Sequence, residues 1–315
     1  KQILDALELL EYRGYDSAGM AIVDETNGQV QIRKRAGRVA DLEKVWKANP
    51  VNGICGIGHT RWATHGGVSD VNAHPHRAGR VTLVHNGIIE NYEELKDHFG
   101  LADELISDTD SEVVAAVLNR FYTGDPHEAL FQTVKCLKGT FALVVIFDDI
   151  PDVIFAIRNV SPIVAAYRED GTMLASDVAA LGGQATSYMV VPEYHVVELH
   201  TDDIRVYNMK NELCEAEFLD IDWDTTRAGK GNYPFYMEKE IMEQPEAIAK
   251  TIAPRISNGR IELGFKHITA EMLKKVNSIK IIGCGSAYHV GFVAGYFMRA
   301  ALRIPVESVL ASEFR

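Results

Sequence analysis

The sequence of 315 residues lacks a long hydrophobic run, a basic run and a patterned set of cysteines. No window of about 18 apolar residues exists, so no segment can span a bilayer as a helix. The net charge is −12 at pH 7. Because an acidic chain without a basic run binds nucleic-acid phosphates poorly, we expect neither a membrane nor a nucleic acid as partner.

The four cysteines are scattered along the chain and form no CxxC pair: Cys55, Cys136, Cys214 and Cys284. Sparse thiols of this kind fit a reducing cytoplasm better than a disulfide-stabilised scaffold. No internal repeat or low-complexity tract is present. With 47% apolar and 24% charged residues, the composition is that of a globular protein. The length predicts about two domains.

Neither end of the sequence carries the signals that normally start or stop a helix. Ile3, Leu7 and Leu10 recur at helical spacing, yet no capping residue precedes them. The last residues, 312–315, have the pattern of a helix that is only beginning. We therefore expect a fragment that lacks residues at both ends; the alternative is that both termini simply fray.

The first part of the chain, residues 1–218, alternates strand-like and helical patterns. Strands are predicted over 30–34, 81–85, 140–147, 153–157, 163–167 and 196–199. Helices are predicted over 91–99, 111–122 and 126–137. Asn91 is the expected N-cap of the first of these helices and Gly100 its stop. Mixed sheets covered by helices predict a layered α/β or α+β domain.

Residues 219–233 change in character: they carry several aspartates and Gly229-Lys230-Gly231 with little periodicity, which predicts a linker. Beyond them, helices are predicted over 238–251, 271–276 and 287–302, and strands over 278–282 and 305–310. The last helix and the two strands form one βαβ unit, which cannot bury its own sheet. We therefore expect a first domain over 1–218, a linker over 219–240 and the first portion of a second domain over 241–315.

Five histidines lie between residues 59 and 85, in polar segments at 58–66, 72–76 and 85–91. One interpretation is a metal site; the other is that the histidines form local hydrogen bonds in loops. Metal sites usually place their ligands at set spacings, and none of the familiar helix-borne patterns occurs here. We therefore expect no bound metal.

Arg61 is the sharpest candidate for a binding residue. A guanidinium flanked by Trp62 and His65 and set between glycines suits bidentate capture of a carboxylate or phosphate, although a surface salt bridge is the common use. Asn86-Gly87 after an apolar strand signals a turn, most often a hairpin. Because a helix follows here instead of a return strand, we expect the Asn86 side chain and the Gly87 N–H to point at one spot as an oxyanion hole.

Two further segments precede predicted helices. In Asp108-Thr109-Asp110, helix capping accounts for at least one carboxylate and leaves the other for a cation. The turn at 283–286 joins a strand to a helix, where backbone N–H groups and the helix dipole suit a phosphate; a plain turn is the alternative. It is not the dinucleotide fingerprint, because Tyr288 occupies the third glycine position. Gly229-Lys230 is not a P-loop either.

Eight short motifs lie in order along the chain, at 11–19, 60–66, 85–91, 107–110, 238–241, 243–245, 283–288 and 312–315. Together they resemble one family, the isomerizing glutamine–fructose-6-phosphate aminotransferases, which form glucosamine 6-phosphate. The resemblance covers essentially the whole chain. Any one motif is moderate evidence, whereas so many in sequence are specific.

The resemblance implies a class II glutamine amidotransferase domain with the αββα sandwich fold of N-terminal-nucleophile enzymes. The start of a doubly wound α/β sugar isomerase (SIS) domain follows it. In the first domain, Arg61 would bind the α-carboxylate of glutamine and Asp110 its α-ammonium group. Trp62, Thr64 and His65 would line the same pocket.

The remaining site residues follow from the same resemblance. Asn86 and Gly87 would hold the oxyanion, and Arg13 would lie near the nucleophile. In the second domain, the residues expected at the sugar phosphate are Gly285, Ser286 and Ala287. Ala287 departs from the family, where a hydroxyl residue is common at that position.

The nucleophile itself is the main departure. In the family, a cysteine at the start of the mature chain attacks the glutamine amide, and its own α-amine relays the proton. Lys1 is not that residue, and no cysteine of this sequence lies at a terminus. The absent stretch also carries a central strand, so we expect residues 1–315 alone to be inactive. The groups that open and isomerise the sugar would lie beyond Arg315.

The implied reaction converts glutamine and fructose 6-phosphate to glutamate and glucosamine 6-phosphate. Ammonia would cross a water-poor passage between the domains, with Trp62 as its gate. The resemblance implies a cytoplasmic homodimer that needs no metal or organic cofactor. Two alternatives stay open: another class II amidotransferase, such as a phosphoribosyl-transferring one, or a non-catalytic regulatory module that binds a sugar phosphate.

Overall fold

The computed structural model describes residues 1–53, 55–181, 183–221, 231–264 and 267–314. The chain divides into two compact units, Lys1–Lys239 and Glu240–Arg315. Much of the predicted linker, including Gly229-Lys230, lies outside the described residues. No helix among the described residues is both long enough and apolar enough to cross a membrane.

The first unit contains three sheets whose strand pairs are all antiparallel within the described residues. The seven-stranded sheet consists, in spatial order, of β13 (Leu213–Cys214), β12 (Ile204–Tyr207), β11 (Val196–Leu199), β7 (Ile150–Asn159), β6 (Gly139–Phe147), β5 (Val81–Ile89) and β4 (His76–Ala78). The expectation of mixed sheets is wrong here. Short turns such as the one between β6 and β7 can join only antiparallel neighbours.

Two smaller sheets complete the β-structure of this unit. One consists of β2 (Val30–Ala36), β1 (Ser17–Val23) and β3 (Cys55–Arg61). The other consists of β14 (Leu219–Asp220), β10 (Ser187–Val190), β8 (Val164–Arg168) and β9 (Gly171–Ala175). The outer strands β3 and β9 each pair with one neighbour only among the described residues.

The alternation of side chains along β6 defines the layers. Phe141, Leu143 and Phe147 are fully buried against α3 (Tyr92–Phe99), α4 (Asp110–Phe121) and α5 (Pro126–Cys136). Ala142 and Ile146 point to the opposite face, where they pack on the two smaller sheets. Each large apolar side chain buried in this way stabilises the fold by about 2 kcal/mol.

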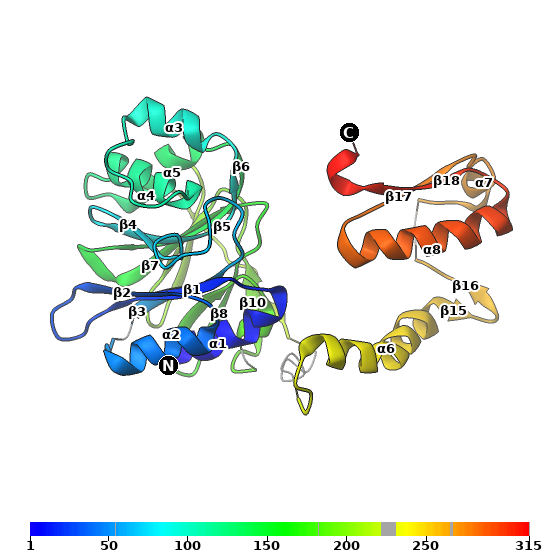
Figure 1. Cartoon of the computed structure of the whole chain (residues 1–315), viewed down its shortest axis with the longest axis horizontal. Helices are drawn as coiled ribbons and strands as arrows, with labels where there is room; N and C mark the ends of the chain where they lie inside the picture. Colours follow the sequence, from blue (N-terminus) through cyan, green and yellow to red (C-terminus); the bar gives the residue numbers. More distant parts are fainter. Residues whose placement is uncertain (54, 182, 222–230, 265–266, 315) are drawn as a thin grey trace. The chain divides into compact units, whose positions relative to one another are not determined.

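A second helical layer covers the three-stranded sheet. It consists of α1 (Gln2–Leu10) and α2 (Val39–Ala48), whose Leu7 and Leu42 pack on Met20 of β1. Figure 1 shows these helices on one side of the unit and α3, α4 and α5 on the other. The order of layers is therefore helix, sheet, sheet, helix, as expected for an αββα sandwich.

The predicted signals around α3 are partly right. Gly100 ends the helix with a left-handed φ of 63°, which glycine adopts without strain. Asn91 occupies the N-cap position, but its side chain makes no capping hydrogen bond. It instead accepts from the Lys138 N–H at 2.8 Å and donates to the Cys136 carbonyl at 2.9 Å. Asn91 thus ties α3 to the end of α5.

The second unit contains the predicted βαβ arrangement. Its elements are α6 (Tyr236–Ile252), which crosses the unit boundary, β15 (Ile256–Ser257), β16 (Arg260–Ile261), α7 (Ala270–Leu273), β17 (Ile279–Gly283), α8 (Gly285–Leu302) and β18 (Val306–Leu310). β17 and β18 pair in parallel, and α8 is their crossover. The predicted βαβ unit is therefore confirmed.

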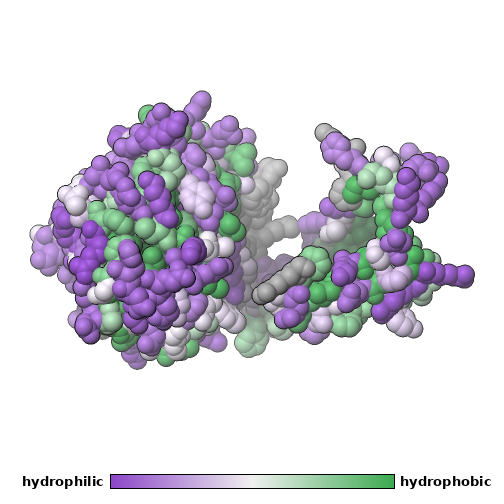
Figure 2. All heavy atoms as spheres, turned by 90° about the horizontal axis from the view of Figure 1, so that it is seen from above, coloured by the Kyte–Doolittle hydropathy of each residue, from purple (hydrophilic) through white to green (hydrophobic). Residues whose placement is uncertain are grey.

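The second unit exposes much of its apolar surface (Figure 2). Val290, Tyr296 and Phe297 on α8 are 65%, 68% and 65% exposed. Val306 is the one buried side chain among the described residues of this unit, and the other buried positions are Gly291 and Gly295. One helix on a two-stranded sheet cannot enclose a core.

The contact between α5 and the seven-stranded sheet makes stability depend on pH. His127 lies 2.8 Å from a Glu198 oxygen through Nε2, and its Nδ1 contacts the Asn211 side-chain oxygen. Both partners are acceptors, so only a protonated ring satisfies both. Burial alone would lower the pKa of His127, but these hydrogen bonds raise it above its usual value. A raised pKa means stability that is complete below the unfolded-state pKa of about 6.5 and is lost as pH rises through the folded-state pKa.

We therefore expect the free energy of unfolding to fall by about 1–2 kcal/mol above pH 6.5 through loss of this charged contact. Urea unfolding of the wild type and of His127→Gln at pH 6 and pH 8.5 measures it. The glutamine does not titrate, so the difference between the two proteins should shrink as pH rises. A difference that is the same at both pH values contradicts the assignment.

Candidate active site

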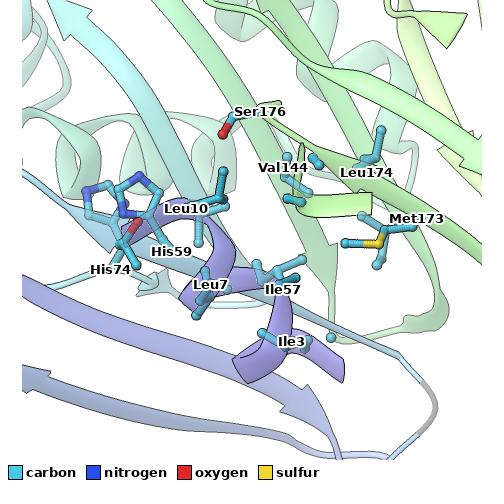
Figure 3. A pocket seen from close by; sticks show the side chains of 18 of the residues that line it. Ile3, Leu7, Leu10, Ile57, His59, His74, Val144, Met173, Leu174 and Ser176 are labelled. Carbon is cyan, nitrogen blue, oxygen red and sulfur yellow. The ribbon is translucent and has the colours of Figure 1, made fainter. Parts of the chain in front are cut away.

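A cavity of about 840 Å³ lies inside the first unit. Its walls include the free edges of β3 and β9, the inner face of α1 and part of β6. Figure 3 shows Ile3 and Leu7 of α1, Ile57 of β3, Val144 of β6 and Met173 of β9 around it. This volume lies within the usual range for small-molecule sites.

One end of this cavity is polar. Every residue that the sequence predicts for the glutamine pocket lines it: Arg13, Arg61, Trp62, Thr64, His65, Asn86, Gly87 and Asp110. They come from four separate segments: the turn after α1, the end of β3 with its following loop, β5, and the first residue of α4. The other predicted group, at 285–287, belongs to the second unit.

Arg61 ends β3 and is buried, with 4% of its surface exposed. Its Nη2 donates to the carbonyls of His65 and Gly66, the latter at 3.0 Å, and its Nη1 donates to the Gly67 carbonyl at 3.3 Å. The expected salt bridge at the surface is wrong in its location: Arg61 Nη1 lies 3.9 Å from the Asp16 carboxylate, but both side chains are largely buried. Three of about five N–H donors hold the residue's own loop, which leaves donors for a ligand and fixes the direction of the guanidinium.

The loop after Arg61 is held by Asp16. The Asp16 N–H donates to the Arg61 carbonyl at 2.7 Å, and its carboxylate accepts from the Ala63 N–H. Trp62, which lies between Arg61 and Ala63 in the chain, is 66% exposed. Its ring lies so close to Gly14 that a Cβ there would be 1.9 Å from a ring carbon. Gly14 thus leaves the room that the Trp62 ring occupies.

Asn86 and Gly87 lie inside strand β5, where they pair with Ala142 and Phe141 of β6. The expected turn at Asn86-Gly87 is therefore wrong. β6 is long enough to continue the pairing as far as Ile89. The φ of +136° at Gly87 still marks a local distortion, and a Cβ there would lie 2.0 Å from the Thr140 carbonyl oxygen. Only glycine fits this backbone.

Asp110 begins α4, but it does not cap it. The cap is Thr109, whose hydroxyl accepts from the Glu112 N–H at 3.2 Å, so the expectation of a capping carboxylate is wrong. The buried Asp110 carboxylate accepts from the Ile89 N–H at 2.9 Å. Within the described residues its one ion-pair neighbour is the His85 ring, at 4.0 Å. Burial lowers the pKa of His85 despite that carboxylate, so the ring is neutral near pH 7 and Asp110 has no cationic partner in the described part of the chain.

A cluster of histidine rings, buried except for the partly buried His59, lies next to these residues. His59 and His74 stack with ring centroids 4.2 Å apart, and His76 meets His74 edge-on at 4.8 Å. Burial lowers the pKa of His59 to about 4 and those of His74 and His76 well below the usual range. Among the described residues no group of histidine, cysteine or carboxylate side chains is arranged to hold a metal ion.

Arg13 lies at the rim of the cavity. Its Nη2 pairs with Asp177, its Nη1 lies 3.3 Å from the Ser176 hydroxyl, and its Nε lies 3.1 Å from the Tyr12 hydroxyl. Burial would lower the pKa of Arg13, but these contacts raise it. The guanidinium therefore links the turn after α1 to the segment after β9.

The predicted phosphate site in the second unit is the start of α8. Gly285 is the first helical residue, with a φ of 54°, and Cys284 is the N-cap without a side-chain capping bond. The helix begins two residues before the predicted position, so Ser286 and Ala287 both lie in its first turn.

Comparison with known proteins shows the family of this chain. The sequence profile described as "Glutamine amidotransferase domain" matches residues 24–234. The chain belongs to the glutamine amidotransferase family. Relatives named glutamine–fructose-6-phosphate aminotransferase (isomerizing) are 40% identical in Clostridium acetobutylicum and 42% identical in Streptomyces coelicolor, each over 99% of this chain and 52% of the relative. The chain thus spans about half the length of these curated relatives.

Solved structures show the same fold. Glutamine phosphoribosylpyrophosphate amidotransferase from B. subtilis, complexed with ADP and GMP, matches with a TM-score of 0.60 at 16% identity, over 97% of this chain and 62% of that one. The allosteric regulatory enzyme of purine biosynthesis matches with a TM-score of 0.58 at 21% identity, over 66% and 46%. The expected class II amidotransferase fold is confirmed for the first unit.

The sequence did not predict the contacts of three further residues that line the cavity: His59, His85 and Ser111. His59 contacts the Asn86 side chain at 2.9 Å, and Ser111 connects the His85 ring, at 2.9 Å, to Asp110, at 3.3 Å. The density of histidines was the available signal. It indicated that residues 59–85 belong to a functional site, but not which side chain each histidine ring contacts.

Proposed function

We propose that the chain supplies the glutamine site of an enzyme that converts glutamine and fructose 6-phosphate to glutamate and glucosamine 6-phosphate. The observation that carries this proposal is the single cavity lined by Arg61, Asn86 and Asp110. The names of the curated relatives, which match 99% of the chain, support the choice of fructose 6-phosphate as the acceptor.

In this proposal Arg61 binds the α-carboxylate of glutamine and Asp110 its α-ammonium group. A buried carboxylate without a paired cation favours a positively charged ligand, because an uncompensated charge in the interior is costly. A guanidinium directed by its own loop is suited to bidentate binding. Trp62, Thr64 and His65 complete the pocket, and Trp62 is also the gate for ammonia.

The same pocket holds the oxyanion between the Asn86 side chain and the Gly87 N–H. We propose that a cysteine attacks the amide and that it is carried by one further strand. The cavity supports this: β3 and β9 both turn a free edge toward it, and one extended strand between them would join the two smaller sheets. Arg13 then lies near the nucleophile.

The second unit is proposed to begin a sugar isomerase domain, with residues 1–218 as the amidotransferase domain, 219–240 as linker and 241–315 as the first isomerase portion. Its exposed apolar helix α8 supports a larger doubly wound fold around it. Gly285, Ser286 and Ala287 at the start of that helix would contact the sugar phosphate. The enzyme is proposed to be a cytoplasmic homodimer that needs no metal or organic cofactor.

Arg61→Ala tests the proposal in the natural polypeptide that contains this chain. We expect the wild type to form glucosamine 6-phosphate, and the variant to show a KM for glutamine about 10–100-fold higher through loss of a charged hydrogen-bond donor. Arg77→Ala is the matched control, because Arg77 pairs with Asp148 and does not line the cavity; its KM should stay unchanged.

Three outcomes contradict the proposal in different ways. An unchanged KM for Arg61→Ala removes the pocket assignment. Glutamate release without glucosamine 6-phosphate indicates another class II amidotransferase, and binding of a sugar phosphate without any glutamine hydrolysis indicates a regulatory module.

A further inference from the structure

The contact between His59 and Asn86 has a defined direction. His59 Nε2 lies 2.9 Å from Asn86 Oδ1. An amide oxygen only accepts hydrogen bonds, so Nε2 carries the proton and donates it. His59 Nδ1 is buried and has no partner among the described residues. Burial lowers the pKa of His59 to about 4, so the ring is neutral near pH 7 and its one proton lies on Nε2, where it is donated to Asn86 Oδ1.

The His59 ring is itself held in place. It stacks on His74 at a centroid distance of 4.2 Å and an interplanar angle of 23°. His74 is fixed in turn, because its Nδ1 accepts from the His85 backbone N–H at 3.2 Å. His85 is the residue before Asn86 on β5. The two ends of the amide therefore differ: Oδ1 is tied to the interior by His59, and the NH2 group is the end left to a ligand.

We propose that His59 is a positioning residue for glutamine hydrolysis, which holds Oδ1 of Asn86 so that the Asn86 NH2 group is presented to the developing oxyanion. The inference rests on the proposed function. A side-chain amide can rotate by half a turn and exchange its oxygen and nitrogen ends. The hydrogen bond from His59 makes one orientation favourable, because the opposite one would place an NH2 group against an N–H.

Three variants of His59 in the natural polypeptide separate positioning from packing. The Nε2 of glutamine occupies about the place of histidine Nε2, so His59→Gln should keep the donor and retain kcat for glutamine hydrolysis within about threefold. In His59→Asn the side chain is too short for its NH2 group to reach Asn86 Oδ1. In His59→Phe the ring remains but the hydrogen-bond donor is lost. For both we expect kcat to fall about 10–100-fold while the KM for glutamine stays within about twofold.

A double-mutant comparison tests whether His59 affects kcat through Asn86. If His59 acts through Asn86, then His59→Asn added to Asn86→Ala should cause no further loss of kcat. A further loss as large as in the wild-type background overturns the inference. So does equal activity of the glutamine and asparagine variants. If Asn86→Ala itself leaves kcat unchanged, the proposed oxyanion hole fails, and that result is distinct from a failure of His59 alone.

A measurement on the wild type covers the case in which the variants do not fold. In ¹⁵N-histidine NMR spectra at pH 7, the His59 ring should show the pattern of the neutral Nε2–H tautomer. The Nδ1–H tautomer would place a bare nitrogen against the amide and would overturn the inference.

Discussion

Replacing Asn86 with alanine is expected to lower kcat for glutamine hydrolysis by about 10²–10³, which corresponds to about 3–4 kcal/mol in the barrier. The KM for glutamine should change little, because the negative charge on the amide oxygen develops only in the transition state. Asn86 lies on β5 and is half-buried, and a hydrogen bond to charge at such a partly desolvated position is stronger than in water. Steady-state glutamate release from the natural polypeptide measures both constants.

Asn159→Ala is the matched control for this prediction. Asn159 is also a strand asparagine, on β7, and its amide donates to the Gly139 carbonyl at 3.0 Å. It does not line the cavity, so its loss should reduce stability by about 1 kcal/mol and leave kcat near the wild-type value. If Asn86→Ala instead raises KM with kcat intact, Asn86 binds the ground state of glutamine and the oxyanion assignment is wrong.

Replacing Gly87 with alanine is expected to damage both stability and activity. The φ of +136° at this position is rarely adopted by residues with a side chain, and the added Cβ would lie 2.0 Å from the Thr140 carbonyl oxygen. Either β5 or β6 has to move, at a cost of about 3–5 kcal/mol. The same movement displaces the Gly87 N–H, so any folded fraction should lose at least about 10²-fold in kcat.

Gly28→Ala separates the effect of backbone strain from the effect of the clash with Thr140. Gly28 also has a left-handed φ, +69°, but a Cβ there would have no neighbour within 4 Å. Its substitution should therefore cost only the backbone strain, about 1 kcal/mol. Urea unfolding of both variants gives the comparison. Equal losses for the two would show that the close approach of β6 does not constrain residue 87.

Much of the secondary structure could be predicted from local pattern. The apolar run in β6, the end of α3 at Gly100 and the βαβ unit at 279–310 all follow from periodicity and turn residues. The errors share one cause. The role of Asn91, the cap of α4 at Thr109 and the continuation of β5 through Gly87 are each decided by a neighbour distant in sequence, which local pattern does not contain.

The sequence by itself determined which chemical groups the site has: a guanidinium, a carboxylate, an amide and a glycine, set in motifs that resemble one family. Only the tertiary structure decided that these groups share a cavity, because β3, β5 and α4 meet there through long-range packing. It also decided that the Arg61 guanidinium donates to its own loop and that His59 contacts the Asn86 side chain. Residue types are encoded locally, whereas the direction of a hydrogen bond depends on atoms that folding brings together.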